Sequence, residues 1–350
     1  MVKGNEGARR SLTGVNQSPA VTVVIPLYNG AAFIKRSVES VLRQSYADFE
    51  LIVVDDGSSD AGPKIVREIT DVRLRLLQQA NAGASAARNR GIAEGRGKYF
   101  GFLDADDEWD VGFLDAATRL AVLYPQAGVY GTGYRMVYPK GPAVEITAEE
   151  RRHGQDSLLV TDYFVRANGG SLINASGVVI PRAVFEEVGL FKNGEHYGED
   201  LEMWSRIALR YPIGYDTRIL FSYHQTAAAN KTRFSEVRRY EPHVRMLQAV
   251  LAKAPDRLQD ANSIEGHIKA RSLQSCFWLI SNSTRAATLV FVDESQIHTW
   301  RPFLAKMVHT RPVWPFLKLA GYLRTVTSSR LFMRALGGQR VTDGVLARLS

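Results

Sequence analysis

The chain has 350 residues, of which 45% are hydrophobic, 23% charged and 10% aromatic. This is the composition of a globular protein with room for two domains, and it excludes disordered, collagen-like and low-complexity proteins. The single cysteine, Cys276, excludes an intramolecular disulfide and a cysteine-built zinc site, and it fits a reducing cytoplasm.

The net charge of +8 is concentrated at the end of the chain. Residues 300–350 carry nine Lys and Arg side chains against one acid, Asp343, whereas basic and acidic residues balance in the rest of the chain. This asymmetry indicates a basic terminal segment rather than a protein-wide nucleic-acid surface. Residues 1–19 have basic residues but no following apolar stretch, so we expect a flexible N-terminal arm and not a secretory signal.

The first part of the chain alternates buried strands with helices. Residues 21–27 form a β-branched run without polar alternation, which is typical of a strand buried on both faces of a parallel sheet. Residues 31–44 follow with apolar side chains at helical spacing. Further strands are expected at 51–54, 73–77 and 99–103, and further helices at 62–69, 84–94 and 111–123. The alternation predicts right-handed βαβ units and an open, mostly parallel sheet of the α/β class.

Beyond residue 125 the pattern is less regular, and it becomes mainly helical after residue 235. Strands are expected at 129–137 and 177–180, and helices at 182–189, 199–210, 236–253, 262–281 and 295–335. The predicted organisation is an N-terminal arm (1–19), an α/β domain (20–235) and a helical C-terminal region (236–350) whose tail is basic and aromatic.

Acidic side chains follow two of the expected strands where those strands end. Asp55 and Asp56 follow the second strand, and Asp104 and Asp106 follow the fourth. Ligands of open α/β sheets bind beyond the carboxyl ends of the strands. Oxygen ligands gathered there favour Mg²⁺ or Mn²⁺, which usually also holds substrate phosphates. A single Asp at such a position is as often a turn or helix cap, but two clusters at strand ends favour a metal site.

The glycines form no phosphate-binding fingerprint, since no G-x-G-x-x-G follows a strand and no G-x-x-x-x-G-K-[ST] occurs. A diphosphate bridged by a metal is therefore the better prediction. A nucleotidyltransferase would need a glycine-rich, basic loop after the first strand. Residues 28–32 (YNGAA) offer one glycine and no Lys or Arg, which ranks that alternative low.

Three blocks of sequence carry a resemblance to a known family. They are VTVVIPLYNGAAFIKRSVESVLRQSYADFELIVVDDGSSD, NAGASAARNRGIAEGRGKYFGFLDADDEW and GLFKNGEHYGEDLEMWSRIAL, in this order between residues 20 and 225. This part of the chain resembles the family 2 glycosyltransferases, which have a GT-A fold and transfer sugars from nucleotide-diphosphate donors with inversion at the anomeric carbon. The resemblance implies a UDP-linked donor, Mg²⁺ or Mn²⁺, and a glycan or lipid-linked acceptor in bacterial surface polysaccharide synthesis.

The resemblance also implies roles for individual side chains at the donor. Asp56, with Asp55 beside it, would accept a hydrogen bond from the imide N–H of a uracil-type base, since a carboxylate only accepts. Arg88 would face the base or a phosphate. The implied nucleotide-binding residues are Pro26, Tyr28, Asn29, Asp55, Asp56, Asn81, Gly83, Arg88 and Asp104.

Asp104 and Asp106 match the D-x-D pair of the family, so Asp106 would bind the metal and Asp104 the ribose or the metal, with Asp107 assisting. His224 is a further implied metal or phosphate ligand, weighed against a purely structural role, which is commoner for a lone histidine.

Glu199 and Asp200 match the E-D pair of the family. Asp200 would be the general base that deprotonates the acceptor hydroxyl, and Glu199 would orient it. Trp204 either walls the acceptor or sugar site or packs in the core. Asn174, with Ala175 and Ser176 after it, is expected to face the acceptor.

The basic tail has two interpretations that the sequence leaves open. Residues 300–323 mix aromatic with basic side chains, and Pro312 and Pro315 interrupt any long helix. The segment either lies on an anionic membrane surface, peripheral to the inner face of the plasma membrane, or packs against the catalytic domain. No nucleic-acid partner is expected, because no nucleic-acid module is recognised. A nucleotide-binding scaffold of a polysaccharide assembly complex is the alternative function, and the intact acidic motifs argue against it.

Overall fold

In a computed structural model of the chain, we describe residues 18–167, 172–195, 198–225, 242–253, 261–268 and 270–271. Two compact units are present: Met1–Tyr163 with Gly170–Thr226, and Phe164–Gly169 with Ala227–Ser350. The N-terminal arm up to residue 17, the domain boundary near residue 235, the helix expected at 295–335 and the basic tail lie outside the described residues, and they stay predictions.

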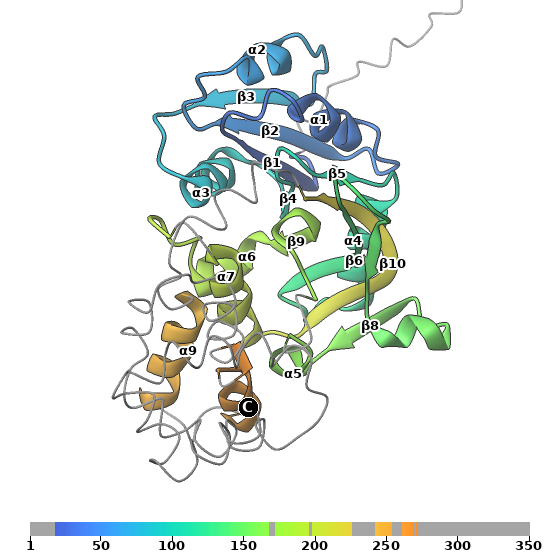
Figure 1. Ribbon diagram of the computed structural model, residues 1–350, viewed down its shortest axis with the longest axis vertical. Helices are drawn as coiled ribbons and strands as arrows, with labels where there is room; N and C mark the ends of the chain where they lie inside the picture. Colours follow the sequence, from blue (N-terminus) through green and yellow to red (C-terminus); the bar gives the residue numbers. More distant parts are fainter. Residues whose placement is uncertain are drawn as a thin grey trace, which may run out of the picture. The chain divides into compact units, whose positions relative to one another are not determined.

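The first unit is built on one sheet with the strand order β3-β2-β1-β4-β9-β6-β10-β5 (Figure 1). Its first four strands are β1 (Val21–Leu27), β2 (Phe49–Asp55), β3 (Leu74–Gln78) and β4 (Tyr99–Phe102). They pair in parallel, and β1 matches β2 over its whole length from Val21↔Phe49 to Leu27↔Asp55. The chain moves outward from β1 to β3 and then returns to the other side of β1 as β4. The strand order thus reverses between β1 and β4, where open α/β sheets place their ligands.

A second group of strands continues the sheet beyond β4. The strands are β5 (Glu108–Trp109), β6 (Val129–Val137), β7 (Val144–Ile146), β8 (Ser157–Val160), β9 (Val178–Pro181) and β10 (Ile213–His224). Strand β9 runs antiparallel to both β4 and β6, with Phe102 opposite Val178, and thereby joins the two groups. The three longest pairings, β6–β10, β1–β2 and β2–β3, are all parallel, which confirms the mostly parallel α/β fold.

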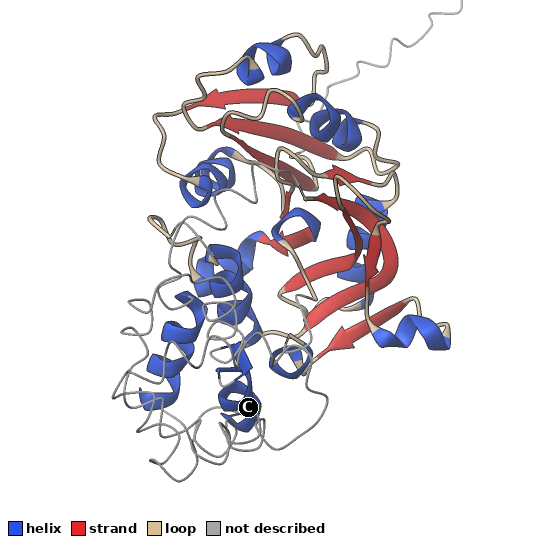
Figure 2. Cartoon of the chain, viewed as in Figure 1, coloured by secondary structure: helices blue, strands red, loops and turns tan. Residues whose placement is uncertain are grey.

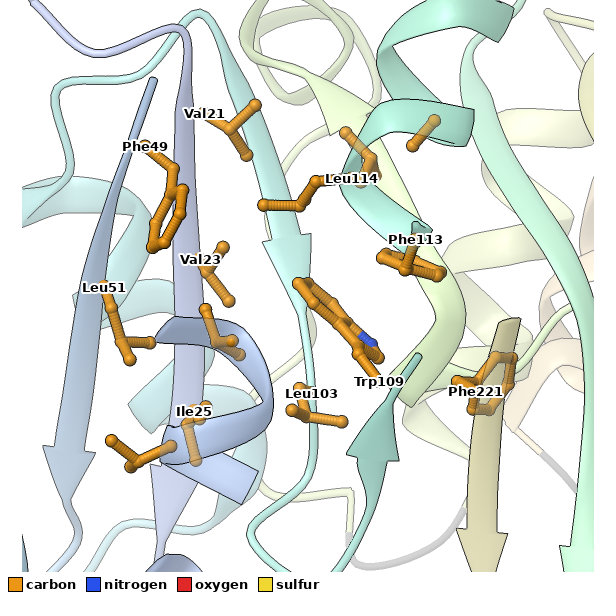
Figure 3. Close-up of a cluster of buried hydrophobic side chains, with 14 of the residues drawn as sticks. Val21, Val23, Ile25, Phe49, Leu51, Leu103, Trp109, Phe113, Leu114 and Phe221 are labelled. Atoms are coloured by element: carbon orange, nitrogen blue, oxygen red, sulfur yellow. The ribbon is translucent and has the colours of Figure 1, made fainter. Parts of the chain in front are cut away.

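The two faces of β1 are covered by different helices. Val21, Val23 and Ile25 share a buried cluster with Phe113 and Leu114 of α4 (Phe113–Leu123), and side chains of α1 (Ile34–Leu42) belong to it (Figure 3). Val24 points to the opposite face, under α3 (Ala84–Glu94). A Cβ atom at Gly91 of α3 would overlap the Val24 side chain, so this glycine allows the helix to approach the strand closely.

Shorter helices complete the described part of the first unit (Figure 2). They are α2 (Gly62–Arg67), α6 (Arg182–Val188) and α7 (Glu199–Ala208), with the 3-10 turns η1 (Glu149–His153) and η2 (Ala175–Gly177). Helix α5 (Tyr163–Arg166) begins at the last residue before the chain enters the second unit at Phe164.

The described part of the second unit is helical. It contains α9 (Pro242–Lys253) and helical residues 261–268, in line with the helices expected there. The buried rings of His243 and His267 lie 5.6 Å apart, and Phe164 lies 5.6 Å from His267. In the part of the chain that the structure describes, no helix combines the length and apolar character that crossing a membrane requires.

Candidate functional site

The turn after β2 is organised by Asp55. This buried carboxylate accepts hydrogen bonds from the Ser58 backbone N–H (2.9 Å) and from the Gln78 side-chain amide of β3 (3.0 Å). Each of its oxygens is therefore already engaged within the protein. Asp55 thus caps the turn, and its contact with a nucleotide stays a prediction.

Asp56 shapes the loop that leads into α3. Its Oδ1 accepts from the Gln79 side-chain amide (2.8 Å) and the Ala82 N–H (2.9 Å), and its Oδ2 accepts from the Gly83 N–H (2.8 Å). Gly83 has φ +91°, a conformation that glycine adopts without steric cost. A carboxylate has about four acceptor positions, so Asp56 retains acceptor capacity beyond these three bonds. Asn81 lies in the same loop.

The end of β1 is tied to this turn. Asn29 has φ 50°, its N–H donates to Ser58 Oγ (3.0 Å), and its Oδ1 accepts from the Ser59 N–H (2.8 Å). Pro26 lies within β1 opposite Val54 of β2. Tyr28 is 56% exposed, an unusual state for an aromatic ring. The structure thus brings Pro26, Tyr28, Asn29, Asp55 and Asp56 to one edge of the sheet.

Arg88 connects two distant acidic segments. Its side chain is 3% exposed, and it donates from Nη2 to Asp104 Oδ1 (2.8 Å) and from Nη1 to Glu199 Oε1 (3.0 Å). Burial alone would lower the pKa of Arg88, but the charges of Asp104 and Glu199 outweigh it and raise that pKa above its usual value. This cation therefore brings the end of β4 together with the start of α7. A role facing the base or phosphate stays a prediction.

The D-x-D segment follows β4 directly. Asp104 is 31% exposed, and its N–H donates to Ser176 Oγ (3.1 Å). Burial and the negative charge of Asp104 raise the pKa of Asp106 to about 6, and the nearby Arg36 offsets only part of the effect. Two carboxylates are thus crowded on this turn.

Asp107, the next residue, is fully buried and structural. It accepts hydrogen bonds from Ser176 Oγ and from the His224 N–H (2.8 Å), and it links the turn to η2 and to the end of β10. Burial raises the pKa of Asp107 well above its usual value. The sequence placed Ser176 only in a segment facing the acceptor, and its bonds to the D-x-D turn were missed, because a serine before a short strand carries no signal of such a distant partner.

The residues around Asp106 suit a hard cation that is completed by substrate phosphates. No group of three or more His, Cys, Asp or Glu side chains surrounds a common point within the described ranges. Asp104 and Asp106 nevertheless supply oxygen ligands whose mutual repulsion a cation would relieve, and phosphates often complete such sites. The His224 ring nitrogen Nε2 is buried without a hydrogen bond and lies 3.8 Å from Glu108 Oε2. Burial and the charge of Arg36 lower the pKa of His224, which favours the neutral ring, the form that binds metals.

Helix α7 carries the E-D pair in its first turn. Glu199 is held by Arg88, and Asp200 Oδ1 accepts from the Leu201 N–H (2.8 Å). Burial and the charge of Glu199 raise the pKa of Asp200 to about 7, against the opposing charge of Arg88. A general base works best with a pKa close to the operating pH. The charge of Asp200 also acts on Tyr134 of β6, whose pKa burial raises to about 12.

Two residues expected at the acceptor have other contacts in the structure. Trp204 is 0% exposed, and its ring packs edge to face against Phe191, with centroids 6.2 Å apart. This position favours the core alternative for Trp204. Asn174 Oδ1 accepts from the Ser176 N–H (2.9 Å) and caps the turn η2, which leaves a contact with the acceptor as a prediction.

Comparisons with known proteins agree with the fold. The family model for glycosyl transferase family 2 matches residues 22–164. An uncharacterized glycosyltransferase of Rickettsia prowazekii (strain Madrid E) is 29% identical over 64% of this chain and 70% of its own length. The uncharacterized glycosyltransferase EpsJ of Bacillus subtilis (strain 168) is 44% identical over 33% of this chain and 34% of its own. A crystal structure of S. aureus TarS residues 1–349 in complex with UDP-GlcNAc has a TM-score of 0.60 at 18% identity, covering 84% of this chain and 82% of that one, which shows a shared fold.

Proposed function

We propose that the chain, whose residues 22–164 match the model of glycosyl transferase family 2, moves a sugar from a UDP-linked donor to a hydroxyl of a glycan or lipid-linked acceptor with inversion at the anomeric carbon. The observation that carries this proposal is the Arg88 bridge, which joins Asp104 of the D-x-D segment to Glu199 of the E-D pair at 2.8 and 3.0 Å. Donor-binding and proton-accepting groups are thereby held next to each other, as transfer between two substrates requires.

Asp200 is the proposed general base. As the acceptor oxygen bonds to the anomeric carbon, the bond from that carbon to the diphosphate oxygen breaks, and the hydroxyl proton passes to Asp200. The attacking oxygen approaches opposite the leaving group, which inverts the anomeric centre. A pKa of about 7 leaves Asp200 sufficiently basic and largely ionised just above neutral pH. Glu199, held by Arg88, keeps the first turn of α7 in place.

Asp106 and Asp104, with His224 as a further ligand, would hold Mg²⁺ or Mn²⁺. A bound divalent cation supplies charge compensation to the departing diphosphate and orients it. Asp56 would accept the imide N–H of the base with the acceptor capacity that its three internal bonds leave, and the exposed Tyr28 ring would stack on the base. The UDP-GlcNAc complex of the structurally similar TarS supports a nucleotide-sugar donor.

A thermal-shift screen of nucleotide sugars tests the donor. A ligand that binds only the folded protein raises the midpoint, by an amount that corresponds to about 2.7 kcal/mol at a hundred times its dissociation constant. We expect UDP and UDP-sugars to raise the midpoint with Mn²⁺ and much less with EDTA. No shift with any nucleoside diphosphate in Mn²⁺ would refute the proposal. Hydrolysis of the bound donor then separates an enzyme from a nucleotide-binding scaffold, which turns over nothing.

We also propose that the basic residues of 300–350 attach the enzyme to an anionic membrane surface on the cytoplasmic side, where a lipid-linked acceptor would be found. Each cationic side chain near such a surface contributes about 1 kcal/mol. Sedimentation with anionic vesicles, comparing the full chain with a chain ending at residue 299, is the test. Equal partitioning of the two proteins would contradict it.

A further inference from the structure

Two adjacent residues of α1 hold three consecutive backbone carbonyls of the D-x-D turn. Ser37 Oγ lies 2.7 Å from the Ala105 oxygen and 2.6 Å from the Asp107 oxygen. Arg36 donates from its Nη2 to the Asp106 oxygen between them. The hydroxyl of Ser37 has one proton and so serves one of its two carbonyls at a time. Together with Arg36 it contacts the carbonyls of all three residues 105–107 from the same helix.

The orientation of these peptide groups decides where the neighbouring carboxylates point. A turn residue has only two soft backbone angles, so fixing the carbonyls on both sides of Asp106 fixes its Cα–Cβ direction. Ser37 is 0% exposed, so no water replaces its hydroxyl when the side chain is shortened. Carbonyls that lose a buried donor leave their position or remain unsatisfied, and either outcome moves the turn.

Helix α1 is itself a fixed reference for this turn. Ile34 and Val38 lie in the hydrophobic cluster at 0% exposure. Further along the helix, Ser40 Oγ accepts from the Trp109 N–H (3.1 Å), and Gln44, which follows the end of α1, donates to the Asp110 carbonyl (2.8 Å). The helix thus runs alongside residues 105–110, but only its first turn contacts the segment that carries the D-x-D carboxylates.

The charge of Arg36 faces the same segment. Its Nε lies 3.7 Å from Glu108 Oε2, and the same Glu108 oxygen lies 3.8 Å from His224 Nε2. Arg36 therefore lies next to both the Asp106 carbonyl and the Glu108 carboxylate, and that carboxylate in turn lies next to His224. Lysine at this position would keep the charge but would lose the planar, multidentate donor set of the guanidinium.

We propose that Arg36 and Ser37 are positioning residues that set the Asp104 and Asp106 carboxylates for the donor diphosphate and its cation. This inference rests on the proposed function. Partners that orient ligating carboxylates typically account for about 10- to 100-fold in metal affinity or activity. A loss of that size in Mn²⁺-dependent UDP binding is therefore expected when Ser37 loses its hydroxyl.

The test compares Ser37→Ala with Ser40→Ala. Both substitutions remove one buried hydroxyl from the same helix, from residues 0% and 1% exposed, so their general effects on stability are matched. Calorimetry gives the UDP affinity with and without Mn²⁺. Amide hydrogen exchange follows the N–H groups of Asp104 and Asp107, which bond to Ser176 Oγ (3.1 Å) and to the Asp104 carbonyl (3.1 Å). Arg36→Met, with Arg36→Lys for partial rescue, is the second pair if Ser37→Ala does not fold.

We expect Ser37→Ala to accelerate exchange at Asp104 and Asp107 and to weaken UDP binding about 10- to 100-fold in Mn²⁺, with little change in EDTA. Ser40→Ala should accelerate exchange at Trp109 instead. Equal exchange and affinity in the two serine variants would overturn the inference, as would faster exchange with unchanged affinity. If the wild type binds no nucleoside diphosphate, the proposed function fails, and the exchange rates alone still decide whether Ser37 holds the turn.

Discussion

Removal of the Arg88 cation is the sharpest test of how the acidic segments are held together. Arg88→Met keeps the unbranched apolar stem but deletes both ion pairs. The structure then leaves Glu199, whose side chain is 16% exposed, and Asp104, which is 31% exposed, without their cation. Breaking a buried pair by removing one partner typically costs about 3–5 kcal/mol, because the remaining charge is uncompensated.

Because Asp104 is partly exposed, water compensates part of its charge. We therefore expect the free energy of unfolding to fall by about 3 kcal/mol, the lower end of that range. For a unit of this size, such a loss lowers the melting temperature by roughly 6–12 °C. Chemical denaturation followed by circular dichroism measures the change. Arg90→Met on the same helix is the matched control. Arg90 is 45% exposed, and its ion pair with Glu94, one helical turn away at 3.3 Å, is a surface pair. Such helix pairs contribute about 0.3–0.5 kcal/mol.

A second substitution separates the ion pairs from packing. Adding Glu199→Gln to Arg88→Met removes one of the stranded charges, so the double variant should recover part of the lost stability. Equal unfolding midpoints for Arg88→Met and Arg90→Met would refute the bridge. No recovery in the double variant would show that the loss comes from packing and not from charge.

The remaining predictions concern the reaction and the close packing of α3. Asp200→Asn should reduce transfer about 10²- to 10⁴-fold while UDP affinity stays unchanged; near-full turnover would remove Asp200 as the base. Because the pKa of Asp200 is raised to about 7, kcat/KM should rise with pH through about 7 and then level off. The same raised pKa means that the contribution of Asp200 to stability is present below its usual value of 3.8 and is lost as the pH rises to about 7, which pH-dependent denaturation checks. Asp106→Ala should weaken UDP binding in Mn²⁺ and not in EDTA, and unchanged calorimetric affinity in Mn²⁺ would argue against the metal assignment. Gly91→Ala should destabilise by about 1–3 kcal/mol through overlap with Val24, and an unchanged melting temperature would contradict that close approach.

The fold could be predicted where hydrophobic periodicity is uninterrupted. Strands β1 and β6 and helix α3 have the residue limits that the sequence predicted. An uninterrupted apolar run marks β1, whereas α3 was recognised by its small residues. Strand β10 was missed. Its first half carries Asp216, which is 0% exposed yet ion-paired with Arg119 and Arg218 at 2.8 Å, and the register shifts after it. A buried charge in mid-strand breaks the apolar pattern, and its partners are visible only after folding.

The site could be predicted only in part for the same reason. Acidic side chains at strand ends and the E-D pair are local patterns, so the sequence alone could propose Asp104, Asp106 and Asp200 as site residues. The Arg88 bridge spans 111 residues between its partners Arg88 and Glu199, and no local pattern encodes such a distance. Trp204 shows that a local pattern can also be ambiguous. An aromatic residue at helical spacing has the same sequence signature in a core and beside a substrate, and only the structure shows that Trp204 is buried.

The reversed direction of β9 explains how a segment 72 residues away reaches the D-x-D turn. An antiparallel strand begins beside the point where its neighbour finishes. Phe102 stands opposite Val178, so two steps further along β4 and two steps back along β9 bring Asp104 to Ser176. Had β9 run the other way, Ser176 would emerge at the far edge of the sheet. One residue inserted between Ser176 and Val178 would break that correspondence, so relatives that vary in length here should do so before residue 174 rather than after it.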